Sequence, residues 1–371
     1  MEKQRSLKPP AEVLYGDELR ALEANDKGPK PLNWRLSPRS IRTFILGSKD
    51  KFELEGRKIQ INKKFYGDDT LVERCIITLA GNRGLMLVGE PGTAKTMLSE
   101  LFSAAICGSS TNTIQGTAGT SEDMVKYTWN YAMLLAKGPI PEAMVPAPLY
   151  IGMKRGMITR FEEITRCPSE IQDSLISILS DKVLIIPELL QDGLIFAAPG
   201  FNVIATANTR DKGVNEMSSA LKRRFNFETV FPINDVSLEV KIITDEVERL
   251  ALDGNIKVKL ETDVVEVLAA TFHELREGIS SEGIRIDRPN AVMSTAEAVS
   301  VCYQTLMTSY YYGNSKISMD SMVQNIVGTV VKENRDDVEK LKNYFNIVVK
   351  SKSLKDGKLW KEYYEARKWI R

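Results

Sequence analysis

Short apolar runs alternate with amphipathic segments between about residues 60 and 232, and this pattern predicts an α/β fold with a parallel sheet. The predicted strands cover residues 85–88, 113–115, 158–161, 201–205 and 227–231. Two more runs, 182–187 and 194–198, flank a Gln-Asp-Gly turn and predict a hairpin inserted between two core strands. After residue 234 the strand pattern stops. Helical periodicity over 237–252, 262–277, 289–311 and 335–349 then predicts an all-helical domain.

The first part of the chain has a different pattern. Residues 1–35 are rich in Pro, Lys and Glu and predict an extended arm with one short helix. Ser37 then provides an N-cap, Pro38 a first helical residue and Gly47 a stop, which together predict a second helix. We therefore divide the chain into an arm with a short helix (1–59), an α/β core (60–233) and a helical domain with a C-terminal helix (234–371).

The amino-acid composition excludes several classes of protein and leaves the predicted fold unchanged. Of the 371 residues, 43% are hydrophobic and 27% are charged, which excludes a disordered, collagen-like or membrane-embedded chain. Lysine and arginine (50) balance aspartate and glutamate (49), so no overall field attracts nucleic acid or anionic lipid. The uncharged stretches 101–121 and 193–209 are too polar or too interrupted to span a bilayer, and we expect a cytoplasmic protein.

Cysteine and histidine usage excludes two classes of site. The 4 cysteines lie far apart with no Cys-x-x-Cys pair, which argues against a zinc site or a disulfide framework. His273 is the only histidine, so a Ser-His-Asp hydrolase or a histidine-ligated metal enzyme would depend on that residue alone. We discount both.

Residues 89–96 read Gly-Glu-Pro-Gly-Thr-Ala-Lys-Thr between a predicted strand and a helical segment, which is the context of a phosphate-binding loop. In such a loop backbone N–H groups surround the phosphates, Lys95 reaches the β- and γ-phosphates, and the Thr96 hydroxyl holds Mg²⁺. The strict pattern has Gly before the lysine, so we expect Ala94 to adopt a negative φ. The alternative, a chance glycine-rich turn, is disfavoured because strand, loop and helix are in register. The predicted nucleotide contacts are Gly89, Glu90, Pro91, Gly92, Thr93, Ala94, Lys95, Thr96 and Met97.

The strand 158–161 is followed by two carboxylates, Glu162 and Glu163. At this position in a P-loop ATPase the first acid orients the Mg²⁺ shell and the second polarises the attacking water, and we assign these roles to Glu162 and Glu163 respectively. The alternative is a pair of solvated acids at a strand end.

Two further polar features follow the acids. Asn208 ends the apolar run that begins at residue 201, where an amide can hold a water in line with the γ-phosphate; the alternative is an Asn that starts a turn. Arg223 and Arg224 stand at a predicted helix end before a strand. They fit an arginine finger, which stabilises the charge that develops on the γ-phosphate, or they simply complement the helix dipole.

With these elements in this order, the sequence resembles the AAA+ ATPase superfamily, specifically its MoxR-type branch, over about residues 60–330. The motifs GEPGTAKT, FEEI, VIATAN and LKRRF stand where that branch has its Walker A, Walker B, sensor 1 and arginine-finger segments. The resemblance makes Lys95 and Thr96 the Walker A residues, Glu163 the catalytic glutamate, Asn208 sensor 1 and Arg224 the finger. Glu162 stands where the branch usually has Asp, so its carboxylate reaches one methylene further.

The resemblance extends beyond these motifs. Segments 119–156 and 182–198 resemble the branch's insertion in the second helix and its pre-sensor 1 hairpin. Tyr66 and Gly67 resemble the segment that lines the adenine pocket. Asn290 occupies the sensor 2 column, and Arg288, the candidate nucleotide contact, lies two residues earlier. The implied fold is an AAA+ nucleotide-binding core with both insertions, followed by an all-helical lid domain.

The resemblance also implies an activity. Such ATPases use ATP and Mg²⁺ and assemble as rings, usually hexamers, because the finger of one subunit completes the site of its neighbour. MoxR-type members resemble chaperones or remodelling factors that act on protein clients, often with a partner that carries a von Willebrand A-type domain. We therefore expect an ATP-hydrolysing, homo-oligomeric ring protein.

Two other functions stay open. A nucleic-acid motor is one, because residues 350–371 combine basic side chains with aromatic ones. The balanced net charge argues against it, and Leu359, Tyr363 and Ile370 share a helical face that favours a packed terminal helix. The other is a scaffold that binds ATP and barely hydrolyses it, which Glu162 in place of Asp keeps open. A GTPase is disfavoured because the chain lacks a guanine-reading segment, and a small-molecule kinase is disfavoured because it would not need the finger or the helical lid.

Aromatic residues at alternate positions mark the first insertion. Tyr127, Trp129 and Tyr131 point inward if they belong to a simple core strand. On an exposed ring-facing loop the same residues would grip a partner. The sequence leaves both interpretations open.

Overall fold

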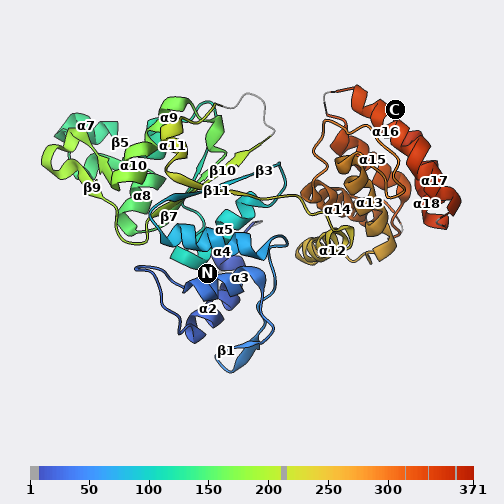
Figure 1. The fold of residues 1–371 in the computed structure, drawn as a ribbon, viewed down its shortest axis with the longest axis horizontal. Coiled ribbons are helices and arrows are strands. Elements are labelled where there is room, and N and C mark those ends of the chain that lie inside the picture. Colours follow the sequence, from blue (N-terminus) through green and yellow to red (C-terminus); the bar gives the residue numbers. More distant parts are fainter. Residues whose placement is uncertain (1–7, 210–214, 314, 333, 356) are drawn as a thin grey trace. The chain divides into compact units, whose positions relative to one another are not determined.

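Five strands form one parallel sheet with the order β11-β3-β10-β7-β4 (Figure 1). Their bounds are β3 (Gly84–Gly89), β4 (Thr113–Gln115), β7 (Ile158–Glu162), β10 (Asn202–Asn208) and β11 (Phe225–Thr229). All five predicted strands are present, so the predicted parallel α/β core is confirmed. Because the strands are parallel, the carboxyl ends of β3, β7 and β10 meet at one edge of the sheet.

The computed structural model describes residues 8–209, 215–313, 315–332, 334–355 and 357–371. The chain forms two compact units, Met1–Gly89 with Ala94–Phe231 and Glu90–Thr93 with Pro232–Arg371. The first unit contains the sheet and the second contains the carboxy-terminal helices. Among the described residues, no helix has both the length and the apolar character needed to cross a membrane.

Alternate residues of β3 pack on opposite faces of the sheet. Leu85 and Leu87 belong to one buried cluster, and Met86 belongs to the other. Helices α4 (Asp69–Ala80) and α5 (Lys95–Cys107) cover the first face. The second face is covered by α8 (Pro148–Arg155), α9 (Ser169–Asp173), α10 (Leu175–Asp181) and α11 (Ser219–Lys222). The unit is therefore a sheet between two helical layers.

The N-terminal arm contains two helices, α1 (Ala11–Leu14) and α2 (Gly16–Asn25), where we predicted one. Leu19 and Leu22 of α2 are buried in the same cluster as α4 and α5. Lys64 Nζ, which is also buried, donates to Glu18 Oε2 at 2.5 Å. The prediction of a mainly extended arm was wrong because packing, more than local propensity, stabilises short helices.

The helix predicted after Ser37 is confirmed as α3 (Pro38–Leu46). Ser37 Oγ accepts a hydrogen bond from the Ser40 N–H at 3.3 Å, and Gly47 ends the helix at φ +83°. A short antiparallel pair, β1 (Phe52–Leu54) and β2 (Arg57–Ile59), follows.

Two insertions lie between the core strands. The first contains α6 (Glu122–Val125), β5 (Tyr127–Trp129), α7 (Tyr131–Lys137), a 3-10 turn (Pro141–Ala143) and β6 (Met144–Pro146) before α8. The second is the predicted hairpin, formed by β8 (Val183–Ile185) and β9 (Leu194–Phe196), although a 3-10 segment (Pro187–Gly193) replaces the tight turn. The Tyr127 hydroxyl donates to Glu188 Oε2 at 3.1 Å and joins the two insertions. Burial, with this hydrogen bond, raises the pKa of Tyr127 to about 12.

The aromatic residues of the first insertion have two different environments. Tyr127 and Trp129 are half-buried, pack edge to face with centroids 6.1 Å apart, and contact the core of the second sheet face. Tyr131 instead begins α7 and is exposed. The inward alternation is therefore wrong for Tyr131, because the strand ends at Trp129.

The carboxy-terminal unit is helical, as predicted. Its elements are α12 (Val236–Asp253), α13 (Thr262–Glu277), α14 (Thr295–Tyr311), α15 (Met319–Val330), α16 (Asp336–Tyr344), a π-helical segment (Phe345–Val349), α17 (Lys350–Lys355), α18 (Lys358–Glu365) and a 3-10 segment (Ala366–Trp369). The helix predicted over 289–311 begins only at Thr295, because Ser294 and Glu297 form a capping box there. Helix α15 was not predicted.

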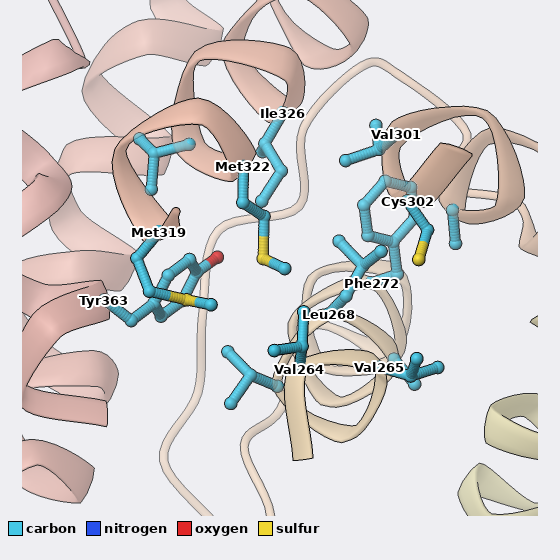
Figure 2. Close-up of a cluster of buried hydrophobic side chains, with 14 of the residues drawn as sticks. Val264, Val265, Leu268, Phe272, Val301, Cys302, Met319, Met322, Ile326 and Tyr363 are labelled. Atoms are coloured by element: carbon cyan, nitrogen blue, oxygen red, sulfur yellow. The ribbon is translucent and has the colours of Figure 1, made fainter. Parts of the chain in front are cut away.

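One apolar cluster holds this unit together. Figure 2 shows Phe272 of α13, Cys302 of α14 and Met322 of α15 within it, together with Tyr363 of α18. Tyr363 and Ile370 are buried, so the terminal segment packs on the domain as its helical face predicted.

Candidate functional site

The segment between β3 and α5 forms a turn that ends at the N-terminus of a helix. Gly92 there has a left-handed backbone at φ +78°. Lys95 is the first residue of α5 and is buried, and its Nζ donates to the Gly89 carbonyl oxygen at 3.1 Å. The predicted strand, loop and helix are thus all present. Lys95 thus begins a helix whose first backbone N–H groups favour anions.

The backbone of Ala94 differs from our prediction. Ala94 has φ +66° and ψ +19°, which is the left-handed helical conformation, so the expected negative φ was wrong. A side chain costs about 1–2 kcal/mol in this conformation relative to the right-handed one. The loop therefore has the backbone conformation that Gly adopts readily, and the methyl group of Ala94 makes this conformation strained.

Glu162, at the end of β7, is 4% exposed and accepts four hydrogen bonds. Its Oε1 accepts from Ser99 Oγ at 2.6 Å and from Arg160 Nη2 at 2.7 Å. Its Oε2 accepts from Thr96 Oγ1 at 3.0 Å and from Thr206 Oγ1 at 2.8 Å. This carboxylate therefore joins the phosphate-loop helix α5 to strands β7 and β10, and its burial is compensated.

Glu163 is adjacent but lies in a more open setting. Its side chain is 34% exposed, and its Oε2 pairs with Arg166 Nε at 2.6 Å. The backbone is left-handed at φ +53°, which turns the chain out of β7 into the 3-10 turn Ile164–Arg166. The Glu163 N–H donates to Thr206 Oγ1 at 2.9 Å. Of the two acids, this is the one that solvent reaches.

Asn208 ends β10, the strand between β3 and β7. It is paired in register with Gly89, and the N–H of Thr209 donates to the Gly89 carbonyl oxygen at 3.1 Å. The amide therefore lies at the edge of the sheet where both the loop and the acids begin.

The two arginines before β11 differ in their contacts. Arg224 is half-buried, and its guanidinium donates to Ser180 Oγ at 2.8 Å and to the Ala220 carbonyl oxygen at 3.0 Å. Arg223 is exposed. Arg224 is thus held at the surface by α10 and α11.

Comparison with known proteins identifies the family. Residues 84–225 match the AAA domain of the dynein-related subfamily, and residues 237–371 match the YehL-like AAA+ ATPase C-terminal domain. YehL of Escherichia coli strain K12, an uncharacterised protein, is 48% identical over 361 residues, which cover 97% of this chain and 96% of YehL. The chain belongs to the YehL-like AAA+ ATPases.

The chain also has more distant matches. The chaperone MoxR1 of Mycobacterium tuberculosis is 27% identical over 177 residues, which cover 47% of this chain and 43% of MoxR1. Among solved structures, NtrX from Brucella abortus in complex with ADP is 13% identical with a TM-score of 0.48, over 77% of this chain and 62% of that chain. The predicted relationship to MoxR-type AAA+ ATPases is confirmed by the family and sequence matches.

Sequence reasoning missed four residues of this YehL-like site. Ser99, Arg160 and Thr206 bind Glu162, and the Gly116 N–H donates to the Glu162 carbonyl oxygen at 2.7 Å. A Cβ at Gly116 would lie 2.3 Å from the Glu163 carbonyl oxygen, so only Gly fits there. One signal was available. Arg160 interrupts an apolar strand and shares a face with Glu162, two residues later.

The remaining predicted contacts of this YehL-like ATPase stay predictions. Tyr66 is half-exposed just before α4, with Lys63 Nζ 5.8 Å from its ring centre, and Gly67 follows it. Met97 packs against the first sheet face. In the carboxy-terminal unit, the Arg288 Nε donates to the Glu277 carbonyl oxygen at 3.0 Å.

The donor set at the end of β7 is suited to Mg²⁺. Thr96 offers a hydroxyl oxygen and Glu162 a carboxylate oxygen 3.0 Å away, and hard oxygen donors are the ligands that Mg²⁺ prefers. Because Glu162 already accepts four hydrogen bonds, it fits a role that orients Thr96 and the ion's water shell. The donor chemistry of these two residues therefore suits the ion, and their role as its ligands stays a prediction.

Proposed function

We propose that this YehL-like chain hydrolyses ATP and uses the energy to remodel protein clients. The hydrogen bond from Thr96 Oγ1 to Glu162 Oε2, at 3.0 Å, is the observation that carries this proposal. It brings the phosphate-loop hydroxyl and the acidic strand end to one place, which hydrolysis of a nucleoside triphosphate requires and a simple anion-binding loop does not. Bound Mg²⁺ would supply charge neutralisation for the phosphates.

Each group has a separate task in the proposed reaction. The Lys95 ammonium contacts the β- and γ-phosphate oxygens and neutralises part of their charge. Asn208 holds the attacking water in line. Glu163 takes the proton of that water as its oxygen bonds to the γ-phosphorus and the bond to the β,γ-bridging oxygen breaks, which releases ADP and phosphate. The partial exposure of Glu163 supports this assignment over Glu162.

A ring, most simply a hexamer, follows from the role proposed for Arg224. Its guanidinium lies at the surface on α10 and α11, so we infer that it reaches the γ-phosphate of a neighbouring subunit. A planar cation there stabilises the charge that develops during transfer. Each site is then complete only between two copies of the chain.

Exposed apolar side chains of the two insertions support a protein client. Tyr131 and Leu135 of α7 and Phe196 of β9 are all well exposed. Apolar and aromatic side chains bind unfolded protein segments with little cost in entropy. We also propose that the protein acts in the cytoplasm and that it has a partner with a von Willebrand A-type domain. Both proposals rest on the relationship to MoxR-type proteins.

A specific observation favours one alternative, the ATP-dependent scaffold. The ion pair between Glu163 and Arg166 engages the carboxylate that should polarise water, as expected for an ATP-dependent scaffold that hydrolyses slowly. The nucleic-acid motor loses support, because the terminal aromatic residue Tyr363 is buried in the domain core. The rate of ATP hydrolysis distinguishes the slowly hydrolysing scaffold from the proposed ATPase.

The test compares the wild-type chain with Lys95→Ala. We expect phosphate release from ATP with Mg²⁺ by the wild type, and loss of both ATP binding and release in Lys95→Ala, with binding followed by calorimetry. Lys137→Ala, at the exposed end of α7, is the matched control and should bind as the wild type does. Unchanged ATP affinity in Lys95→Ala would overturn the site. Tight binding without release by the wild type would favour the scaffold.

A further inference from the structure

Arg160 is a buried arginine in the middle of β7. Its side chain is 5% exposed and lies on the same face of the strand as Glu162. The guanidinium donates from Nε to Ser99 Oγ at 2.9 Å, from Nη1 to the Ser110 carbonyl oxygen at 2.6 Å, and from Nη2 to Glu162 Oε1 at 2.7 Å. All three nitrogen atoms are therefore engaged, and the group is fixed in orientation.

In this arrangement the two oxygen atoms of the Glu162 carboxylate have different partners. Arg160 and Ser99 hold Oε1, which leaves Oε2 directed at Thr96 Oγ1. Glu has one more rotatable bond than Asp, so its carboxylate needs an additional anchor to keep one position. A planar guanidinium fork supplies direction as well as charge, which a lysine would not.

The same arginine connects the site to the N-terminal arm. Ser110, whose carbonyl oxygen accepts from Arg160, donates its N–H and its hydroxyl to Glu12 Oε2 of α1 at 2.9 and 2.7 Å. The Ala11 N–H donates to Ser110 Oγ at 3.3 Å. A continuous chain of hydrogen bonds thus runs from the arm through Ser110 and Arg160 to Glu162.

We propose that Arg160 is a positioning residue for Mg²⁺-dependent ATP binding, that it acts through Glu162, and that α1 of the arm supports it through Ser110. The inference rests on the proposed function, because it concerns the same site. It assigns the arm a part in nucleotide binding. It also explains how a glutamate serves at this strand end.

The experiment measures ATP affinity of the full-length chain by calorimetry, once with Mg²⁺ and once with EDTA. The ratio of the two dissociation constants is the contribution of the ion and does not depend on turnover. We expect Arg160→Met to reduce this ratio by about tenfold or more, as loss of a group that orients a metal ligand does, while affinity in EDTA stays within about twofold. Arg160→Lys, which keeps the charge and loses the fork, should fall between.

Ser99→Ala provides a second test if Arg160→Met fails to fold. It removes a donor to Glu162 Oε1 and the acceptor of the Arg160 Nε hydrogen bond, and it leaves the ion pair between Arg160 and Glu162 in place. It should reduce the ratio in the same direction. The arm is tested by a matched pair. Glu12→Gln removes the negative charge from the acceptor of two Ser110 hydrogen bonds and should lower the ratio by about two- to tenfold. Glu23→Gln, which breaks the arm's ion pair with Arg35, should leave the ratio unchanged.

The outcomes separate the two proposals. A wild-type chain that binds no ATP contradicts the proposed function itself. A wild-type chain that binds ATP with Mg²⁺, together with folded Arg160→Met, Arg160→Lys or Ser99→Ala chains that keep the wild-type ratio, overturns the positioning role alone. Equal ratios for Glu12→Gln and Glu23→Gln would show that the arm takes no part in positioning Glu162.

Discussion

Glu162 and Glu163 are adjacent in sequence, yet their carboxylates lie in opposite surroundings. Glu162 is 4% exposed and accepts four hydrogen bonds, whereas the Glu163 side chain is 34% exposed and pairs with Arg166. The difference arises at the end of β7, where the left-handed backbone of Glu163 turns the chain. One acid is thus structural and orienting, and the other is accessible to water.

The two acids should therefore differ in their effect on stability. We expect Glu162→Gln to destabilise the unit that contains the sheet by about 3–5 kcal/mol, because it removes the carboxylate charge that lies 2.7 Å from the buried Arg160 guanidinium and leaves this cation with the more distant Glu100 Oε1, at 3.6 Å. Glu163→Gln should cost about 0–1 kcal/mol, since its ion pair is exposed. Thermal unfolding without nucleotide, followed by circular dichroism, measures both. Equal melting temperatures would contradict the buried network.

Ala94→Gly should stabilise the chain. Glycine removes the strain of about 1–2 kcal/mol at φ +66°, and the greater entropy of the unfolded chain offsets about 0.4–1 kcal/mol of it. We expect the melting temperature to rise by about 1–4 °C. Ala24→Gly, at an exposed helical position in α2, is the control and should lower it. A fall of equal size in both variants would show that Ala94 carries no strain.

Arg224→Ala should bind ATP normally and lose turnover by about 10³-fold, as removal of an arginine finger does. Arg223→Ala, the exposed neighbour, serves as the control and should retain turnover. A loss confined to Arg223→Ala would reverse the assignment of the two arginines.

The shared site can be tested by mixing two inactive chains. Arg224→Ala subunits keep Glu163, and Glu163→Gln subunits keep the finger, so a mixed ring contains some complete sites. Partial recovery of phosphate release is expected. No recovery, with subunit exchange demonstrated by fluorescence transfer, would argue against a site between copies.

Two substitutions in the first insertion should affect folding and client binding separately. Trp129→Ala removes a half-buried ring and should destabilise the chain by about 1–3 kcal/mol, less than for a fully buried Trp. Tyr131→Ala should alter stability by at most about 0.5 kcal/mol because the ring is exposed. We expect Tyr131→Ala to lower the ratio of casein-stimulated to unstimulated ATP hydrolysis. An unchanged ratio would place the client surface elsewhere.

Local signals in the sequence were sufficient for much of the fold and of the loop. The strand before Gly89, the glycines of the turn and the helix after Lys95 are adjacent in the chain, and each has its own pattern. The strand 158–161 and the two carboxylates that follow it were recognisable for the same reason. Boundaries were less reliable where a cap decides them, as Ser294 does for α14.

The parts that escaped prediction depend on distant residues. Ser99 and Thr206 reach Glu162 from α5 and β10, and no local pattern shows these two contacts, whereas Arg160 could have been found from its place on the same strand face. The left-handed Ala94 is a consequence of the loop's geometry, which overrides the preference of alanine. Helix α2 forms because Leu19 and Leu22 are buried against the core, a contact invisible in its own sequence.

The central claim, that the chain hydrolyses ATP with Glu163 as the group that activates water, is tested most directly with Glu163→Gln. ATP binding and phosphate release are measured on the same preparation, beside the wild type and Glu162→Gln. We predict that Glu163→Gln binds ATP within about twofold of the wild type while its release falls by about 10²-fold or more. Release at the wild-type rate by Glu163→Gln, or trapped ATP in Glu162→Gln alone, would contradict the claim.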